Sequence, residues 1–131
     1  MMQCVAQLPQ GIVVLPGLDW YADDAAWDNI DLEEANKYLG DSKFHMVFGT
    51  LGQRDQRSRK VIRSLWQRAD KKFYDVNLRP PFTTVDIVEE SLEVADLVKV
   101  NDEELLELGR SYDLFDEDGK IVARNLFFLL G

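Results

Sequence analysis

The middle of the chain alternates short apolar runs with longer stretches that have a helical period. Three apolar runs have the length and the β-branched and aromatic content of buried strands: 45–51, 71–77 and 96–101. Each precedes a segment in which apolar residues recur every three or four positions, as in a helix with one buried side: 58–70, 83–96 and 102–109. This alternation predicts an α/β fold, a Rossmann-like parallel sheet flanked by helices and joined by right-handed crossovers.

The two ends of the chain fit this alternation less well. Residues 10–17 predict a strand, and 18–40 predict an acidic, aromatic loop that leads into a helix near 31–39. Residues 113–120 form a turn-rich acidic patch, and 121–131 predict a last apolar helix or strand. The length of 131 residues predicts a single α/β domain. Because the last apolar run stands at the end of the sequence, we expect the domain to belong to a longer chain.

Local signals predict where two of the helices begin. Thr83 and Asp86 are spaced as a capping pair for the helix over 83–96. Asn101 and Glu104 have the spacing of a capping box, in which the Asn side chain accepts a backbone N–H bond and the Glu reaches back. Gly109 is expected to close the helix that Asn101 starts.

Charge and composition narrow the classes of partner. The net charge of -9 makes a nucleic-acid partner unexpected, since phosphate backbones are held by clustered Lys and Arg. The basic residues of 53–68 are spread around a helix and predict a solvated face. Cys4 is the single cysteine, which rules out an internal disulfide or a Cys-rich zinc site and favours a reducing, cytoplasmic setting. No apolar run approaches the roughly 18 residues of a membrane helix, so no membrane contact is expected.

Two polar clusters follow predicted strands. Asp75, Asn77 and Arg79 leave one strand, and Asn101 and Glu104 leave the next strand along the chain. Ligands of parallel sheets collect beyond the carboxyl ends of the strands, where an arginine can hold phosphate and a carboxylate can hold Mg²⁺ directly or through water. Two structural alternatives remain open: a turn with a local ion pair for the first cluster, and a helix cap for the second.

Other residues have simpler interpretations. His45 is interpreted as the start of a buried strand, because one histidine makes neither a zinc site nor a catalytic triad. Trp20, Trp27 and Trp66 are interpreted as packing residues. The sequence contains no GxGxxG, GxxxxGK[ST], GxSxG or HExxH motif. The residues alone therefore lead to an α/β domain with a candidate crevice for phosphate and magnesium.

Three segments, in this order and spacing, resemble the central part of the ribokinase-like (pfkB) family of carbohydrate kinases, especially its fructokinase-like members. They read FGTLGQRDQRSR, FYDVNLRPPF and ADLVKVNDEELLEL. The upstream AAWDNI also resembles a piece found in one branch of that family. The similarity covers about residues 19–108.

The resemblance implies specific roles. Asn101 and Glu104 match an Asn-x-x-Glu element near the ATP phosphates, in which Glu104 would act on Mg²⁺ through metal-bound water. Asp75, Asn77 and Arg79 match an Asp-x-Asn-x-Arg element near the sugar and the transferred phosphoryl group. Gly49 to Gln53 match a segment that borders the sugar. The implied ligands are ATP, Mg²⁺ and a sugar whose hydroxyl receives the γ-phosphoryl group.

The chain also departs from the family pattern. Family members are about twice as long or longer, and the glycine-rich, sugar-binding segment and the lid with which they begin are not found before residue 19. The Gly-Ala-Gly-Asp segment, whose Asp is the catalytic base and whose N–H groups form the anion hole, is also absent. We therefore expect no catalytic residue in this chain and no activity of the chain alone.

Two further hypotheses belong to other classes. The chain is alternatively a non-catalytic α/β binding or interaction module, which could form a homodimer through exposed apolar surface. It is also compatible with an unrelated flavodoxin-like or receiver-type domain. Loss of magnesium-nucleotide binding on replacing Asn101 and Glu104, without unfolding, would favour the kinase interpretation.

Overall fold

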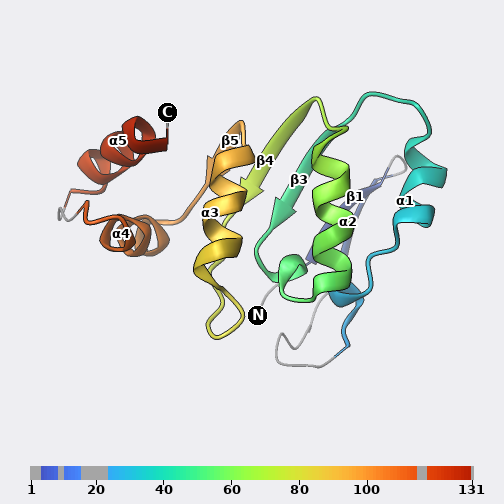
Figure 1. Ribbon diagram of the computed structural model, residues 1–131, viewed down its shortest axis with the longest axis horizontal. Coiled ribbons are helices and arrows are strands. Elements are labelled where there is room, and N and C mark those ends of the chain that lie inside the picture. Colours follow the sequence, from blue (N-terminus) through green and yellow to red (C-terminus); the bar gives the residue numbers. More distant parts are fainter. Residues whose placement is uncertain (1–3, 9–10, 16–23, 115–117, 131) are drawn as a thin grey trace.

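A three-stranded parallel sheet forms the centre of the molecule (Figure 1). The computed structural model describes residues 4–8, 11–15, 24–114 and 118–130. The sheet has the order β3-β4-β5, with β3 at His45–Gly49, β4 at Lys71–Asp75 and β5 at Leu97–Lys99. The predicted α/β arrangement is therefore confirmed at this level, with strands that are shorter than the apolar runs that predicted them.

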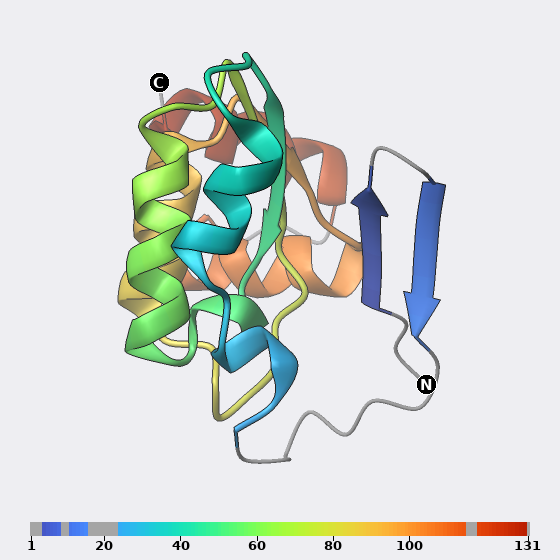
Figure 2. The same cartoon turned by 90° about the vertical axis from the view of Figure 1, so that its right-hand side faces the viewer.

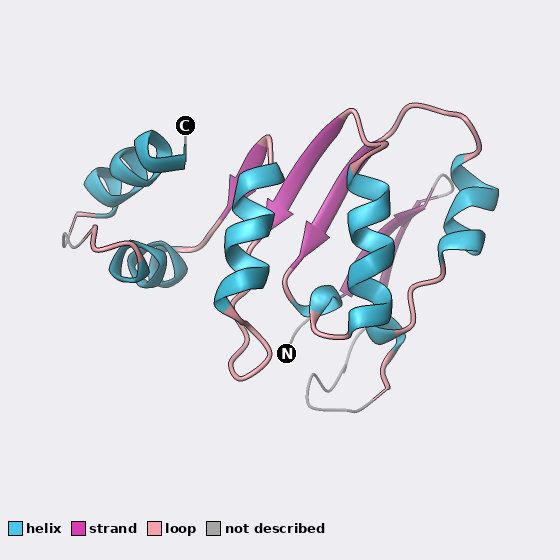
Figure 3. Cartoon of the chain, in the orientation of Figure 1, coloured by secondary structure: helices cyan, strands magenta, loops and turns pink. Residues whose placement is uncertain are grey.

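Helices and a hairpin surround this sheet (Figures 1 and 3). Figure 2 shows α2 and α3 on the same face of the sheet and the β1–β2 hairpin on the opposite side. The remaining bounds, in chain order, are β1 Cys4–Leu8, β2 Gly11–Leu15, η1 Ala26–Asp28, α1 Leu32–Leu39, η2 Leu51–Gln53, α2 Gln56–Trp66, α3 Val85–Val94, α4 Asp102–Ser111 and α5 Gly119–Leu130.

The core lies between the sheet and the helices α2 and α3. Phe48, on β3, stacks on Tyr74 of β4 with ring centroids 5.2 Å apart, and its ring centroid lies 5.1 Å from that of Trp66 on α2. Alternate strand residues point to this face, as the period of two requires. The buried cluster comprises Phe48, Ile62, Trp66, Tyr74, Val76, Val88, Leu92, Leu108 and Leu126.

The other face of the sheet carries an apolar row. Val47, Phe73 and Leu97 are direct partners in the register of the three strands. Val47 is 75% exposed and Leu97 is 56% exposed. Parallel sheets in proteins usually have both faces covered. Here two of the three residues in this row are exposed, and Phe73 between them is partly buried.

Several boundaries differ from the sequence predictions. Gly109 lies inside α4 and does not close it, since α4 continues to Ser111. The glycine lies instead where α5 packs closely, because a Cβ there would lie 2.5 Å from Val122 Cγ1. The last apolar segment is helical, with Val122 and Leu126 buried. The strand β1 was not predicted. Trp20 and residues 115–117 of the predicted acidic turn lie outside the described residues.

Two arginines contradict the predicted solvated face of 53–68. Arg59 is 4% exposed, and it donates to Asp86 at 2.6 Å and to Glu90 at 2.9 Å, which ties α2 to α3. Arg54 forms a paired contact with the buried Asp28, and its guanidinium lies 4.5 Å from the ring centroid of Phe82. The carboxylates that pair with these arginines lie 26 to 31 residues away in sequence.

The side chains of His45 and Trp66 lie in different environments. His45 begins β3, as expected, but its side chain is exposed and its ring lies edge-on to Phe73 at 6.5 Å. Trp66 is buried in the core, which confirms its packing role. Trp27 is partly buried, with the Arg54 guanidinium 5.7 Å from its ring centroid.

Candidate functional site

The first polar cluster begins where β4 ends. Asp75 is the last residue of β4 and lies directly opposite Lys99, the last residue of β5. The Lys99 Nζ lies 3.0 Å from Asp75 Oδ1. The ion pair of Asp75 therefore crosses to the neighbouring strand and is not local to the turn. It also brings one anion and one cation to the carboxyl end of the sheet.

Asn77 and Arg79 lie beyond the strand, in the turn that follows it. Asn77 has a φ of 44°, a left-handed conformation that asparagine tolerates better than most residues. The Arg79 backbone N–H donates to Thr83 Oγ1 at 2.6 Å, and its guanidinium Nη1 donates to the carbonyl oxygen of Leu78 at 2.7 Å. Only Asp75 among the three predicted site residues is therefore a strand residue.

The use of Thr83 in this turn changes the start of α3. Because the Thr83 hydroxyl accepts from Arg79, it is not the cap that the sequence predicted. The N-cap of α3 is Thr84, whose hydroxyl donates to Asp86 and caps no backbone N–H. The prediction of a Thr83–Asp86 capping pair is wrong by one residue.

The second cluster forms the predicted capping box. Asn101 Oδ1 accepts from the Glu104 N–H at 2.8 Å, and Glu104 Oε2 accepts from the Asn101 N–H at 3.1 Å. This geometry satisfies two N–H groups at the start of α4. Asn101 is exposed, whereas Glu104 is only 6% exposed. The structural alternative for this pair is thus confirmed, and any role in binding comes in addition to it.

Glu104 has a third bond that the capping box does not require. Its Oε1 accepts from the backbone N–H of Leu78 at 3.0 Å, across 26 residues of sequence. Leu78 lies between Asn77 and Arg79, so the carboxylate joins the segment that leaves β4 to the start of α4. The two polar clusters that the sequence placed at neighbouring strand ends are therefore brought together by one buried side chain.

A buried polar network supports the ends of β3 and β4. The Tyr74 hydroxyl lies 2.6 Å from Thr50 Oγ1, and Thr50 in turn donates to the Val76 carbonyl oxygen. Gln53 Nε2 donates to the Gly49 carbonyl oxygen at 3.0 Å and to Ser91 Oγ at 2.9 Å. Burial raises the pKa of the Tyr74 phenol, although its hydrogen bond to Thr50 acts in the opposite direction.

Sequence reasoning missed this network. Thr50, Gln53 and Ser91 are fully buried polar residues, and Gln53 lies in the segment whose resemblance implied a border of the sugar site. One feature of the sequence could have predicted the network: Ser91 is a polar residue within the apolar stripe of the helix over 83–96. Buried polar groups normally find partners, so such a position predicts an internal hydrogen bond.

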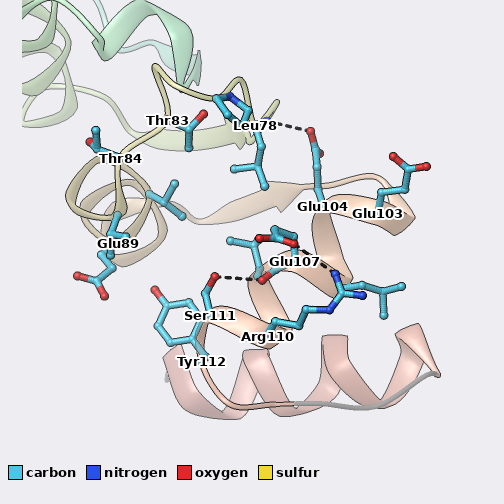
Figure 4. Close-up of a pocket in the computed structure, with 15 residues that line it drawn as sticks. Leu78, Thr83, Thr84, Glu89, Glu103, Glu104, Glu107, Arg110, Ser111 and Tyr112 are labelled. Carbon is cyan, nitrogen blue, oxygen red and sulfur yellow. Dashed lines mark hydrogen bonds and ion pairs between the residues drawn. The ribbon is translucent and has the colours of Figure 1, made fainter.

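A groove lies beside these residues, between α3 and α4 (Figure 4). It has a volume of about 660 Å³. Its apolar lining includes Leu78, Val85, Val88 and Leu108, and carboxylates stand along it. Figure 4 shows Glu104 at one end of the groove, hydrogen-bonded to Leu78.

These residues fit a magnesium-bound phosphate better than a bare one. Among the described residues no cluster of three or more His, Cys, Asp or Glu side chains could hold a metal ion. Mg²⁺ usually keeps several waters and binds through one or two carboxylates together with substrate phosphates. Each carboxylate oxygen of Glu104 already accepts a hydrogen bond from a backbone N–H group. Its remaining acceptor capacity therefore suits a contact with Mg²⁺ through a water molecule. The carboxylates of Asp102 and Glu103 in the same helical turn would repel an uncompensated phosphate.

Comparisons with known proteins do not identify a family. No protein-family model matches the chain, and no curated protein matches it. Within the described residues, none of the helices has the length and apolar character needed to cross a membrane.

Proposed function

We propose that this chain supplies part of the phosphoryl-transfer crevice of an ATP-dependent carbohydrate kinase. The observation that carries the proposal is the Glu104 carboxylate, which joins the segment after β4 to the start of α4. A group that only capped α4 would not need the bond to Leu78. The order and spacing of the three segments that resemble ribokinase-like kinases support the same assignment.

Each residue has a part in the proposed crevice. Asn101, at the exposed start of α4, lies near the ATP phosphates, and Glu104 contacts Mg²⁺ through water. Asp75, Asn77 and Arg79 lie on the side of the sugar and the transferred phosphoryl group. When bound, ATP supplies that group and Mg²⁺ offsets its negative charge.

Positioning is the main contribution of these residues. Phosphoryl transfer depends on holding the reacting groups in line and on stabilising charge. The bond from Leu78 to Glu104 holds the two sides of the crevice together, and the Lys99–Asp75 pair places one cation and one anion at the two strand ends. No residue is assigned to take the proton of the sugar hydroxyl, because the sequence has no Gly-Ala-Gly-Asp segment.

A non-catalytic interaction module is the second candidate. Two observations favour it: Asn101 and Glu104 satisfy each other in the capping box, and Val47 and Leu97 are exposed on the open face of the sheet. Such a module would need no nucleotide. The two candidates therefore differ in whether the chain binds magnesium-nucleotide.

Asn101→Asp separates binding from capping. Aspartate caps helices about as well as asparagine, so the melting temperature should stay within a few degrees of the wild type. The added negative charge beside a phosphate should weaken binding of a fluorescent ADP analogue with Mg²⁺ by about tenfold or more. Binding should be lost when Mg²⁺ is removed with a chelator.

Asn36→Asp is the matched control. It makes the same change of charge on α1, where Asn36 Oδ1 accepts from Arg68, and should leave nucleotide binding unchanged. The kinase proposal is wrong if the wild-type chain binds no magnesium-nucleotide, or if Asn101→Asp binds it as tightly as the wild type. The first of these results would favour the interaction module.

A further inference from the structure

The groove between α3 and α4 has carboxylates on both sides of an apolar floor, and its lining includes one cation, Arg110. Glu89 on α3 and Glu103 and Glu107 on α4 line it, and all three are exposed. Glu107 lies 3.2 Å from Arg110. Within the described part of the chain, no ion-pair partner lies within reach of Glu89 or Glu103. The groove therefore suits an occupant that is apolar along one line and basic beside it.

The helix α5 presents such a surface to solvent. Its exposed positions follow the helical spacing i, i+3, i+4 and i+7: Lys120, Ala123, Arg124 and Phe127. Phe127 is 71% exposed. The stripe thus combines two cations with a large aromatic ring, a combination that complements the acidic, apolar groove.

The α5 of the same chain cannot present this stripe to its own groove. Val122 and Leu126 form the opposite, buried side of α5, and Val122 packs against α4 at Gly109. The basic stripe therefore points away from the α4 of its own chain. The α5 helix of a second copy is not attached to this α4, so its basic stripe can face the groove.

We propose that the α3–α4 groove binds the α5 helix of a second copy of this chain. Phe127 enters the apolar floor, while Lys120 and Arg124 lie beside the carboxylates of Glu89 and Glu103. Because each copy carries both a groove and a stripe, the contact closes as a reciprocal dimer or continues as a head-to-tail chain. This contact does not require the proposed kinase function, although Glu104 lies at one end of the same groove.

Exchanging the charges tests the contact directly. One variant carries Glu89→Lys and Glu103→Lys, and the other carries Lys120→Glu and Arg124→Glu. In each variant alone, the groove and the α5 stripe carry charges of the same sign and repel each other. Each variant should therefore self-associate at least about tenfold more weakly than the wild type. An equimolar mixture should recover association, since each groove then meets an α5 of opposite charge. Sedimentation velocity over a range of protein concentrations at low salt measures all of these states.

Controls separate the contact from general effects of charge and folding. Glu33→Lys with Asp41→Lys makes the same change of charge on and beside α1 and should leave self-association near the wild-type value. Circular dichroism melting checks that each variant folds, and Glu89→Gln with Glu103→Gln replaces the lysine variant if that one unfolds. Phe127→Ser, at an exposed position, should also weaken association. A wild type that stays monomeric, or a mixture that does not recover association, overturns the proposal.

Discussion

Glu104 accepts a hydrogen bond from the backbone N–H of Leu78 at 3.0 Å, and this bond holds the start of α4 against the segment that leaves β4. The same carboxylate also receives the N–H of Asn101. One buried side chain therefore satisfies two backbone donors from segments that are separated by a whole crossover.

Glu104→Gln should lower the free energy of unfolding by about 1–3 kcal/mol. The glutamine amide offers one acceptor oxygen for two backbone donors, so the N–H of Leu78 or of Asn101 would face an NH₂ group. Urea denaturation measures the change. Glu103→Gln, an exposed change in the same helical turn, should stay within about 0.5 kcal/mol of the wild type. Equal stabilities for the two variants would show that the bond to Leu78 contributes little.

Stability should fall in acid because folded carboxyls have lowered pKa values. Hydrogen bonds from Arg54 hold the pKa of Asp28 below its ordinary value, against the effect of its burial. The hydrogen bond from Thr84, followed by that from Arg59, lowers the pKa of Asp86 to about 2. Such groups stabilise the fold above their unfolded pKa and lose this effect as the pH falls through the folded value. We expect the free energy of unfolding to decline from about pH 4 downwards.

Asp28→Asn tests the buried part of this effect. It leaves the Arg54 guanidinium without its carboxylate, and should cost about 3 kcal/mol at pH 7 while making the decline below pH 4 shallower. Asp41→Asn, at an exposed position, should change the stability by no more than about 0.5 kcal/mol. A decline in acid that is as steep in Asp28→Asn as in the wild type would assign the sensitivity to other carboxyls.

Gly109→Ala should destabilise the chain, although alanine normally favours a helix interior by about 0.5–1 kcal/mol. Its Cβ would lie 2.5 Å from Val122 Cγ1 and 3.1 Å from the Leu114 carbonyl oxygen, so α5 would have to move. Gly119→Ala is the matched comparison, because its Cβ would meet Leu105 Cδ2 at an ordinary 3.5 Å. Thermal melting of the two variants should give shifts of opposite sign or a clear difference in size. A stabilising Gly109→Ala would mean that α4 and α5 do not pack as closely as the structure has them.

Tyr74→Phe should cost about 1 kcal/mol by removing the hydroxyl that lies beside Thr50. Thr50→Val should cost more, since it removes the partner of Tyr74 and the donor to the Val76 carbonyl oxygen. In the double variant the two losses should be less than additive, because they share one hydrogen bond. Urea denaturation of the four proteins measures this coupling. Strict additivity would argue against the bond between the two hydroxyls.

The sequence predicted the elements whose signals are local. The alternation that buries Tyr74 and Val76 beside the half-exposed Asp75 follows from the strand period, and the Asn101–Glu104 box follows from its spacing. The start of α3 was placed one residue too early, because the Thr83 hydroxyl is taken by a backbone donor in the preceding turn. Gly109 was expected to end α4, but a glycine also serves where another helix approaches closely, and only the position of α5 decides between these uses.

The contacts that bring the two polar clusters of the candidate site together could not be predicted from the spacing of residues in the sequence. Two neighbouring strand ends were expected to share a crevice, yet the bond between Glu104 and Leu78 depends on the crossover from β4 to β5, which brings the start of α4 beside the segment after β4. The partner of Asp75 depends on the register of β4 and β5, which places Lys99 opposite it. The burial of Arg59 depends in the same way on acids that α3 brings to α2.

The polar network around Thr50 also fixes how β3 and β4 align. In the observed register Phe48 lies opposite Tyr74, and the Tyr74 hydroxyl meets Thr50 just beyond the end of β3. Sliding one strand by a single residue would turn its side chains to the opposite face and separate these hydroxyls inside an apolar interior, where an unpaired polar group is costly. The Thr50–Tyr74 pair therefore adds the cost of two unpaired hydroxyl groups to the loss of hydrophobic burial that a misaligned strand pair already suffers.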